Sequence, residues 1–320
     1  MSVIILYYKE TTMIAKLTPA FKDYLWGGKK LSETYGKAFD GDILAESWEL
    51  SCHPDGESVL ATGQDAGQTL QTWLSNHPAA LGTNCARYAS FPILIKFIDA
   101  KQNLSIQVHP DDDYAIAYEN DNGKNEMWYI AEAEPDAFIY YGFNQTLSKA
   151  EYEQHIANDT ILDVLNKVNV TAGDCFFIEA GTVHAIGAGC LIAEVQQSSN
   201  VTYRVYDFAR RGADGKLREL HVAKAVEVST LAPAVNVAKN SDLLVDCQYF
   251  AVRDIKCTDL ATFTANETSF HSLLVLEGSG SIDSTTETLN FTKGDSIFVA
   301  AGTGKYNLQG DFHALLTYIS

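Results

Sequence analysis

Four side chains of this chain are of types that ligate transition metals, and they fall in three short segments. Gln107 and His109 lie two residues apart, and Glu126 and His184 follow further along. If residues 104–109 form a strand, Gln107 and His109 project from one face and can reach the same ion. Imidazole nitrogens with a carboxylate and an amide oxygen suit a divalent transition metal and leave a position for water or substrate. The set predicts a zinc site with one ion per chain.

The segments around the last two ligands have the pattern of strands that would deliver them. Residues 124–130 alternate and are rich in aromatic side chains, after a polar turn at 121–123. Residues 173–184 run from one glycine turn to another and end on His184. This segment resembles the second motif of the cupins, Gly-x5-Pro-x-Gly-x2-His, with Glu179 in place of the proline. Because that proline shapes a turn and is not a ligand, the change leaves the ligand in place.

Composition limits the classes of protein that could carry this site. At 320 residues with 46% hydrophobic residues, the chain can form one large domain or two to three units with ordinary cores. The net charge of −18 argues against nucleic-acid and membrane partners, so an anionic substrate needs a local cluster of basic side chains. The six cysteines include no Cys-x-x-Cys pair, which favours reduced thiols and a cytoplasmic protein. The pattern does not indicate an oligomeric state.

Short strands dominate the pattern, and helices are predicted at only a few places. These are residues 69–76, 111–119 and 149–167, with a further short helix after Leu220. The helix at 149–167 has Ser148 as its N-cap and Glu151 to complete a capping box. Met13 opens a segment typical of a natural beginning, so we expect residues 1–12 to be an N-terminal extension. A change of character at 233–240 predicts a domain boundary.

An internal repeat crosses that boundary. Residues 172–182 align with residues 293–303 in constant register, and two residues further on Lys305 stands opposite His184. We infer two β-barrel modules: a metal-binding catalytic module at 13–235 with helical insertions, and a degenerate module at 236–320 without the ligands. The alternative is a chance match between two glycine-bounded strands.

Arg204 lies in a strand-like segment between the metal motif and the boundary. It alternates with Tyr203 and Val205, so it points away from their face and could enter the mouth of a barrel. The planar guanidinium of arginine suits a phosphate or a developing oxyanion. For a lone strand arginine the competing interpretation is a surface ion pair.

Taken in order, these motifs resemble those of the type I phosphomannose isomerases in their shorter bacterial form. The similarity covers most of residues 14–230. It rests on the segments at residues 21–28, 46–51, 92–96, 104–110, 123–126 and 203–207. The C-terminal module matches more weakly. One position departs from the pattern: longer members carry a histidine just before the motif lysine, and this chain has Gly123 there.

The resemblance implies a mainly β fold of two cupin-type (jelly-roll) modules with a small inserted helical region. It also implies that the chain interconverts mannose 6-phosphate and fructose 6-phosphate, with zinc on Gln107, His109, Glu126 and His184. Arg204 matches the catalytic arginine of the family. Further active-site positions are matched by Lys96, Lys124 and Glu194, and positions near the substrate by Ser105 and Trp26.

The chemistry that the residues can perform agrees with this implication. Aldose–ketose isomerisation moves a proton between adjacent carbons through an enediol, so it needs a cationic partner for the oxyanion and a proton carrier. Zinc and Arg204 can supply the first, and either Glu194 or Lys124 the second. Two alternatives stay open at this point. A cupin oxygenase would use iron and a set richer in histidine, and a non-catalytic sugar-binding cupin would keep the fold alone.

Overall fold

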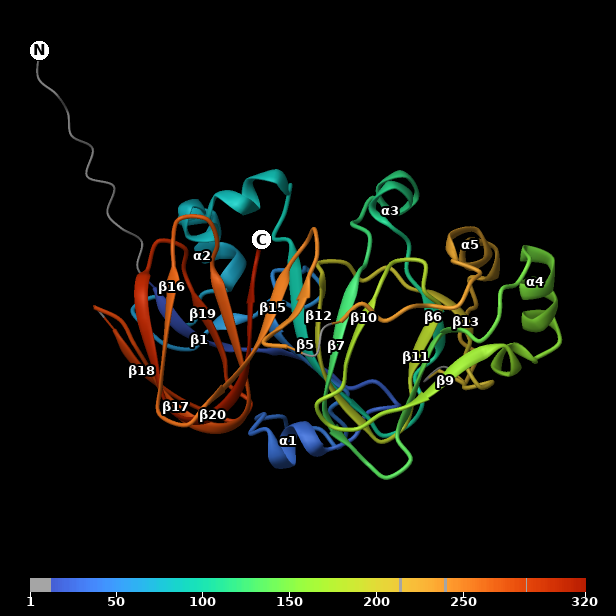
Figure 1. The fold of residues 1–320 in the computed structure, drawn as a ribbon, viewed down its shortest axis with the longest axis horizontal. Helices are drawn as coiled ribbons and strands as arrows, with labels where there is room; N and C mark the ends of the chain where they lie inside the picture. Colours follow the sequence, from blue (N-terminus) through green and yellow to red (C-terminus); the bar gives the residue numbers. More distant parts are fainter. Residues whose placement is uncertain (1–12, 213–214, 239–240, 286) are drawn as a thin grey trace, which may run out of the picture.

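Three β-sheets form most of the computed structural model, which describes residues 13–212, 215–238, 241–285 and 287–320. Figure 1 shows two units side by side, with the orange and red C-terminal strands in one unit and most earlier strands in the other. The prediction of a mainly β chain is confirmed. The expected extension at residues 1–12 lies outside the described residues.

The central layer of the molecule is a six-stranded sheet in the order β10–β7–β12–β5–β3–β2. Its strands are β2 (Ala20–Lys22), β3 (Glu46–Leu50), β5 (Ile93–Ala100), β7 (Glu126–Ala133), β10 (Cys175–Ile178) and β12 (Cys190–Gln197). Every residue of β5 and β12 is buried, because one face packs against the C-terminal unit and the other against a second sheet. Ile95 and Phe97 face the C-terminal unit, so alternation turns Lys96 to the opposite face.

A five-stranded sheet in the order β13–β6–β11–β8–β9 completes the first unit. Its strands are β6 (Ile106–Val108), β8 (Phe138–Phe143), β9 (Leu165–Asn169), β11 (His184–Ile186) and β13 (Tyr203–Tyr206). Trp128, Ile98 and Ile139 belong to the apolar cluster between this sheet and the central one. Its outer face is covered by α4 (Lys149–Ala157) and α5 (Val222–Val228), which lie at one end of the molecule (Figure 1).

The C-terminal unit is built on a nine-stranded sheet in the order β14–β15–β20–β17–β19–β1–β4, with β16 on β20 and β18 on β17. Its strands are β1 (Ile14–Thr18), β4 (Val59–Leu60), β14 (Leu243–Asp246), β15 (Ala251–Cys257), β16 (Leu260–Ala265), β17 (His271–Asp283), β18 (Thr288–Thr292), β19 (Ser296–Val299) and β20 (Gly304–Tyr318). Apolar side chains such as Phe291 and Leu308 fill the interior of the unit. Because β1 pairs with β19, strand pairing crosses the boundary predicted near residue 236, and the division into 13–235 and 236–320 stays a prediction.

The two units have the expected mainly β architecture, but their described sheets do not close into complete barrels. In each described sheet the path of hydrogen-bonded strands has two ends. The first unit is held together instead by side chains packed between its two sheets, among them Trp128 and Ile139. Face-to-face packing buries the apolar side chains without pairing the sheet edges, so closure is not required.

The predicted repeat is visible in the backbone. The strands β10 and β19 each follow a glycine of positive φ, Gly173 at 96° and Gly294 at 89°. In both turns the aspartate after the glycine accepts a hydrogen bond from a threonine backbone N–H: Thr171 to Asp174 at 2.7 Å and Thr292 to Asp295 at 2.8 Å. The two segments therefore share one turn and one strand, which argues against a chance match.

The four predicted helices are present, one of them shorter than predicted, and the helix at Lys30–Thr34 and the 3-10 helices at residues 78–87 were not predicted. The described helices are α1 (Lys30–Thr34), α2 (Leu70–Asn76), α3 (Asp112–Tyr118), α4 and α5, with the short 3-10 helices η1 (Pro78–Leu81), η2 (Thr83–Arg87) and η3 (Ile161–Asp163). The capping box of Ser148 and Glu151 is present at the start of α4. The helix predicted for 149–167 ends at Ala157, because Asp159 takes a left-handed backbone with φ 56°, and the chain continues into η3 and β9. Within the described residues no helix is long and apolar enough to cross a membrane.

Candidate active site

The predicted metal ligands converge between the two sheets of the first unit. In the five-stranded sheet, His184 at the start of β11 pairs directly with Gln107 on β6. Glu126 opens β7 in the facing sheet, and His109 follows β6. The potential ligand atoms of His109, Glu126 and His184 lie within 4.8 Å of one another, and all three side chains are buried. Strand pairing and sheet packing thus bring together residues that are up to 75 positions apart, from His109 to His184.

Both histidines are oriented as metal ligands. The Nδ1 atom of His109 lies 2.7 Å from the Val201 carbonyl, and Nδ1 of His184 lies 2.8 Å from the Thr182 carbonyl. A carbonyl only accepts, so each Nδ1 carries the proton and leaves the lone pair of Nε2 directed at Glu126. Burial lowers the pKa of His109 to about 3 and also lowers that of His184, with Lys124 adding to both shifts. Neutral imidazoles of this kind are what a divalent cation binds.

Glu126 completes the fit to a cation. It is 1% exposed, and its polar contacts within the described residues are with Lys124, His109 and His184. Oε1 lies 2.8 Å from Lys124 Nζ and 3.3 Å from His109 Nε2, and Oε2 lies 3.6 Å from His184 Nε2. Burial opposes ionisation, but the charge of Lys124 and the contacts with His109 and His184 together outweigh it and hold the pKa of Glu126 well below its usual range. A buried anion beside two imidazole lone pairs is a donor set that suits zinc.

Gln107 lies against the same cluster but turns its amide nitrogen inward. Nε2 is 3.5 Å from His184 Nε2, and Oε1 accepts a hydrogen bond from Ser105 Oγ at 3.3 Å. The oxygen and nitrogen of a glutamine amide exchange places by a half-turn of the last torsion angle. Ligation through oxygen therefore requires that half-turn and would leave the amide N–H facing Ser105.

A cavity of about 380 Å³ opens beside these ligands. Its lining includes eight of the ten predicted site residues: Trp26, Lys96, Ser105, Gln107, Lys124, Glu126, Glu194 and Arg204. His109 and His184 lie behind Glu126. The lining also includes residues to which the sequence interpretation gave no role, among them Tyr24, Glu46, Asn200, Thr202 and Arg218. Glu46 begins one of the quoted motifs, whereas nothing in the pattern around Arg218 pointed to this cavity.

A buried acid and base lie side by side in the wall of the cavity. Glu194 on β12 pairs across the sheet with Lys96 on β5, and their charged atoms are 3.0 Å apart. The other oxygen of Glu194 accepts a hydrogen bond from Trp128 Nε1 at 2.8 Å. Burial and the nearby charge of Glu126 raise the pKa of Glu194. Burial favours the neutral amine of Lys96, but Glu194 and Glu46 more than offset this and raise its pKa, so Lys96 is an ammonium.

Arg204 supplies positive charge on the opposite side. It pairs with Gln107 across β13 and β6, and its Nη1 donates to the Glu219 carbonyl at 2.9 Å. Its Nε–H has no hydrogen-bond partner within the described residues. Burial lowers the pKa of Arg204, and the charge of Arg218 adds to that shift. Two guanidinium groups and an unused donor beside a cavity are suited to an anionic ligand.

Gly123, which departs from the family pattern, is required by packing. A Cβ atom at this position would lie 2.4 Å from the Asp111 carbonyl carbon and 2.4 Å from the Asp112 nitrogen. The loop before Lys124 therefore runs against the backbone at the start of α3, and no larger residue fits.

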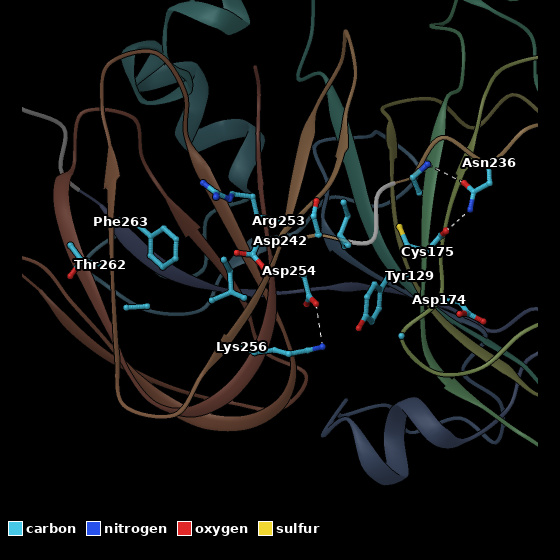
Figure 2. A pocket seen from close by; sticks show the side chains of 16 residues that line it. Tyr129, Asp174, Cys175, Asn236, Asp242, Arg253, Asp254, Lys256, Thr262 and Phe263 are labelled. Atoms are coloured by element: carbon cyan, nitrogen blue, oxygen red, sulfur yellow. Dashed lines mark hydrogen bonds and ion pairs between the residues drawn. The ribbon is translucent and has the colours of Figure 1, made fainter.

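A larger cavity lies elsewhere, between the two units. It measures about 940 Å³, and Figure 2 shows Tyr129 of the first unit pointing toward Asp254 and Lys256 of the second, while Cys175 and Arg253 also line the cavity. Asp254 and Lys256 are paired at 3.4 Å. None of the ten predicted site residues lines it. The chemistry-bearing groups are therefore gathered at the smaller cavity.

Comparison with known proteins agrees with this geometry. Residues 14–141 match the family model of the phosphomannose isomerase type I catalytic domain, and residues 240–319 match that of the mannose-6-phosphate isomerase cupin domain. The chain is 36% identical to mannose-6-phosphate isomerase ManA of Bacillus subtilis, over 94% of this chain and 97% of that protein. It is 34% identical to the mannose-6-phosphate isomerase of Streptococcus mutans, over 92% and 94%.

A solved structure extends the match to the fold. The mannose 6-phosphate isomerase from Bacillus subtilis superimposes with a TM-score of 0.87 at 33% identity, covering 95% of this chain and 99% of that one. The expected cupin-type architecture is thereby confirmed. The chain belongs to the type I phosphomannose isomerase family.

Proposed function

We propose that the chain is a zinc-dependent isomerase that interconverts mannose 6-phosphate and fructose 6-phosphate. The observation that carries the proposal is one cavity that combines a buried His/Glu/His cluster with Arg204 and the Glu194–Lys96 pair. Two relatives that match this chain over nearly their whole length are named mannose-6-phosphate isomerases, and these names support mannose 6-phosphate as the substrate. The partner is thus a small sugar phosphate.

The residues that would hold the metal are His109, Glu126 and His184, with Gln107 as a fourth ligand after its amide turns. One zinc ion per chain would polarise the sugar carbonyl and stabilise negative charge on its oxygen. Lys124, whose ammonium touches Glu126, borders both the ligands and the cavity. We assign it to the substrate hydroxyl groups nearest the metal.

Glu194 is the proton carrier that the site supports best. The reaction moves a proton between the first two carbons of the open-chain sugar through an enediol. A carboxylate whose pKa is raised by burial and by Glu126 is a stronger base than an exposed one, which favours taking up and returning that proton. Lys96, held as an ammonium beside it, keeps the carboxylate oriented. Lys124 is the other candidate for the proton carrier. The two assignments differ in which substitution, at Glu194 or at Lys124, should abolish proton transfer.

Arg204 is assigned to the oxyanion or phosphate of the substrate, because its free Nε–H borders the cavity. Ser105 and Trp26 line the same space and are assigned to sugar contacts. Trp26 is 7% exposed and lies 5.7 Å from the ring of Tyr24, so an edge of this aromatic pair is available to a sugar.

This chemistry belongs to the predicted module at residues 13–235. The predicted module at 236–320 has Lys305 where the first has His184, and side chains such as Phe291 and Tyr306 occupy its interior. We therefore assign no metal to the C-terminal module.

The proposal is tested by measuring bound metal and the conversion of mannose 6-phosphate before and after treatment with a chelator. We expect zinc in about one copy per chain, loss of turnover with the chelator and recovery when zinc is restored. Iron with oxygen uptake would instead indicate an oxygenase. A zinc-loaded protein without isomerase activity would indicate a sugar-binding module.

A further inference from the structure

The C-terminal unit reaches the first unit through a tight turn between β14 and β15. Within this turn Cys247 N donates to the Phe250 carbonyl at 3.0 Å. The carbonyl of Gln248 is held by Arg87 Nη2 at 2.8 Å and Tyr88 Oη at 3.0 Å, from the segment that precedes β5. The turn is therefore fixed in place, and it presents the next side chain, Tyr249, to the start of α3.

The Tyr249 hydroxyl hydrogen-bonds to the carboxylate of Asp112, which accepts two further hydrogen bonds. It donates to Asp112 Oδ2 at 2.7 Å. The other oxygen of Asp112 accepts hydrogen bonds from Gly123 N at 2.8 Å and from Gln197 Nε2 at 2.9 Å. Gly123 directly precedes Lys124, and only a residue without a side chain allows this close approach. Asp112 thus joins the C-terminal unit to the active-site loop.

From Asp112 the hydrogen bonds continue to the backbone that carries the ligands. Gln197 Oε1 accepts from the backbone N–H of Asn125 at 2.9 Å and from its Nδ2 at 2.7 Å. Because its Nε2 donates to a carboxylate, the orientation of this amide is unambiguous. Asn125 Oδ1 in turn accepts from Ala180 N at 2.9 Å, in the turn that leads to His184. Asn125 stands between Lys124 and Glu126 in the chain.

We propose that Tyr249 is a positioning residue of the active site, acting through Asp112 and Gln197 on the loop that holds Lys124 and Glu126 against His184. The metal ligands come from three separate strands, so their spacing depends on what ties the strand ends together. The hydrogen bonds from Tyr249 through Asp112, Gln197 and Asn125 connect these strand ends. Tyr249 itself belongs to the C-terminal unit, which contributes none of the predicted metal ligands. The proposal rests on the proposed isomerase function, but the bonds themselves can be tested without it.

The variant Tyr249→Phe removes the hydroxyl and keeps the ring. In the metal-free protein, hydrogen exchange at the Gly123 and Asn125 amides should become about tenfold faster, as expected when a bond to a charged acceptor is lost. In the zinc-loaded enzyme kcat should fall about three- to tenfold with KM nearly unchanged, because catalytic groups shift while sugar contacts stay. Tyr88→Phe is the matched control: it removes one tyrosine hydroxyl from the same turn, leaves the Arg87 bond to Gln248 and the Tyr249 bond to Asp112 in place, and should keep both readings at wild-type values.

A second comparison tests the route. If Tyr249 acts through Asp112, then Tyr249→Phe should add nothing to the effect of Asp112→Ala on kcat. Additive effects, or exchange rates at Gly123 and Asn125 equal to those of wild type in Tyr249→Phe, would overturn the proposal. An inactive wild-type enzyme would refute the proposed function instead, and the exchange measurement on the metal-free protein would still decide the role of Tyr249.

Discussion

At the scale of single residues, the two buried carboxylates of the site, Glu126 and Glu194, lie in different electrostatic environments. Glu126 is held as an anion by the Lys124 ammonium and faces two imidazoles whose Nε2 lone pairs are available to a cation. Glu194 is kept apart from the ligands by its bonds to Lys96 and Trp128. Two carboxylates in one cavity thus have pKa values shifted in opposite directions, which is the arrangement by which one acid ligates and another transfers protons.

Replacing Arg204 by alanine should lower turnover while leaving the metal bound. The guanidinium borders the cavity but contacts none of the three clustered ligands, so kcat should fall about a hundred- to a thousandfold. Steady-state kinetics and metal analysis of the purified variant measure both quantities. Arg211→Ala is the control, because that side chain is bonded to the Gly215 carbonyl outside the cavity. Loss of zinc from Arg204→Ala would contradict the assignment.

The variant Glu194→Gln keeps the shape of the side chain and removes its basic oxygen. If Glu194 carries the proton, kcat should fall about a hundred- to ten-thousandfold. Exchange of the sugar proton with deuterated solvent, followed by NMR, should fall in parallel. Glu132→Gln, which alters a pair with Lys293 away from the cavity, should behave as wild type. Retained exchange in Glu194→Gln together with its loss in Lys124→Met would transfer the role to Lys124.

At the scale of elements, local patterns were sufficient for the ligand strands but not for every boundary. The strands β6, β7 and β10 lie where alternation and glycine turns predicted them, because such signals sit within a few residues of each other. The helix predicted for 149–167 was too long, since Asp159 ends it by a backbone conformation that the apolar pattern does not reveal. Residues 165–169 instead form the strand β9, because they pair with β8, a strand that lies earlier in the sequence.

Gly123→Ala tests the packing between α3 and the loop before β7. The added methyl group would meet the backbone of Asp111 and Asp112, which cannot yield without moving the start of the helix. We expect the free energy of unfolding to fall by about 1–3 kcal/mol, with a larger fractional loss of kcat as Lys124 is displaced. Urea denaturation and kinetics measure the two effects. A fully active variant of wild-type stability would show that this loop adapts freely.

At the scale of the whole molecule, the central sheet is buried between the five-stranded sheet and the C-terminal unit. This is why Lys96, a charged residue on a strand, lies in the interior at 4% exposure. The two-unit arrangement followed from the repeat, but the pairing of β1 with β19 joins residues far apart in sequence and had no local signal. The same holds for Arg218, which reaches the cavity only once the sheets are packed.

The packed interior of the C-terminal unit should also make the stability of the molecule depend on pH. His271, at the start of β17, lies with Nδ1 2.7 Å from the Tyr306 hydroxyl, and burial lowers its pKa from 6.5 to about 4. Between these values the unfolded chain binds the proton and the folded chain does not, so the free energy of unfolding rises with pH and is lost on acidification. His271 should contribute up to about 1.4 kcal/mol per pH unit to the slope of the free energy of unfolding against pH.

Replacing His271 by glutamine should remove that part of the slope, because glutamine does not titrate. Denaturant unfolding of the wild type and of His271→Gln, measured from pH 8 down to about pH 4, should give curves that converge as the pH falls. The wild type should lose its advantage over the variant within the window between its two pKa values. Parallel curves across this window would show that the imidazole is already charged in the folded protein and that the C-terminal interior is open to water.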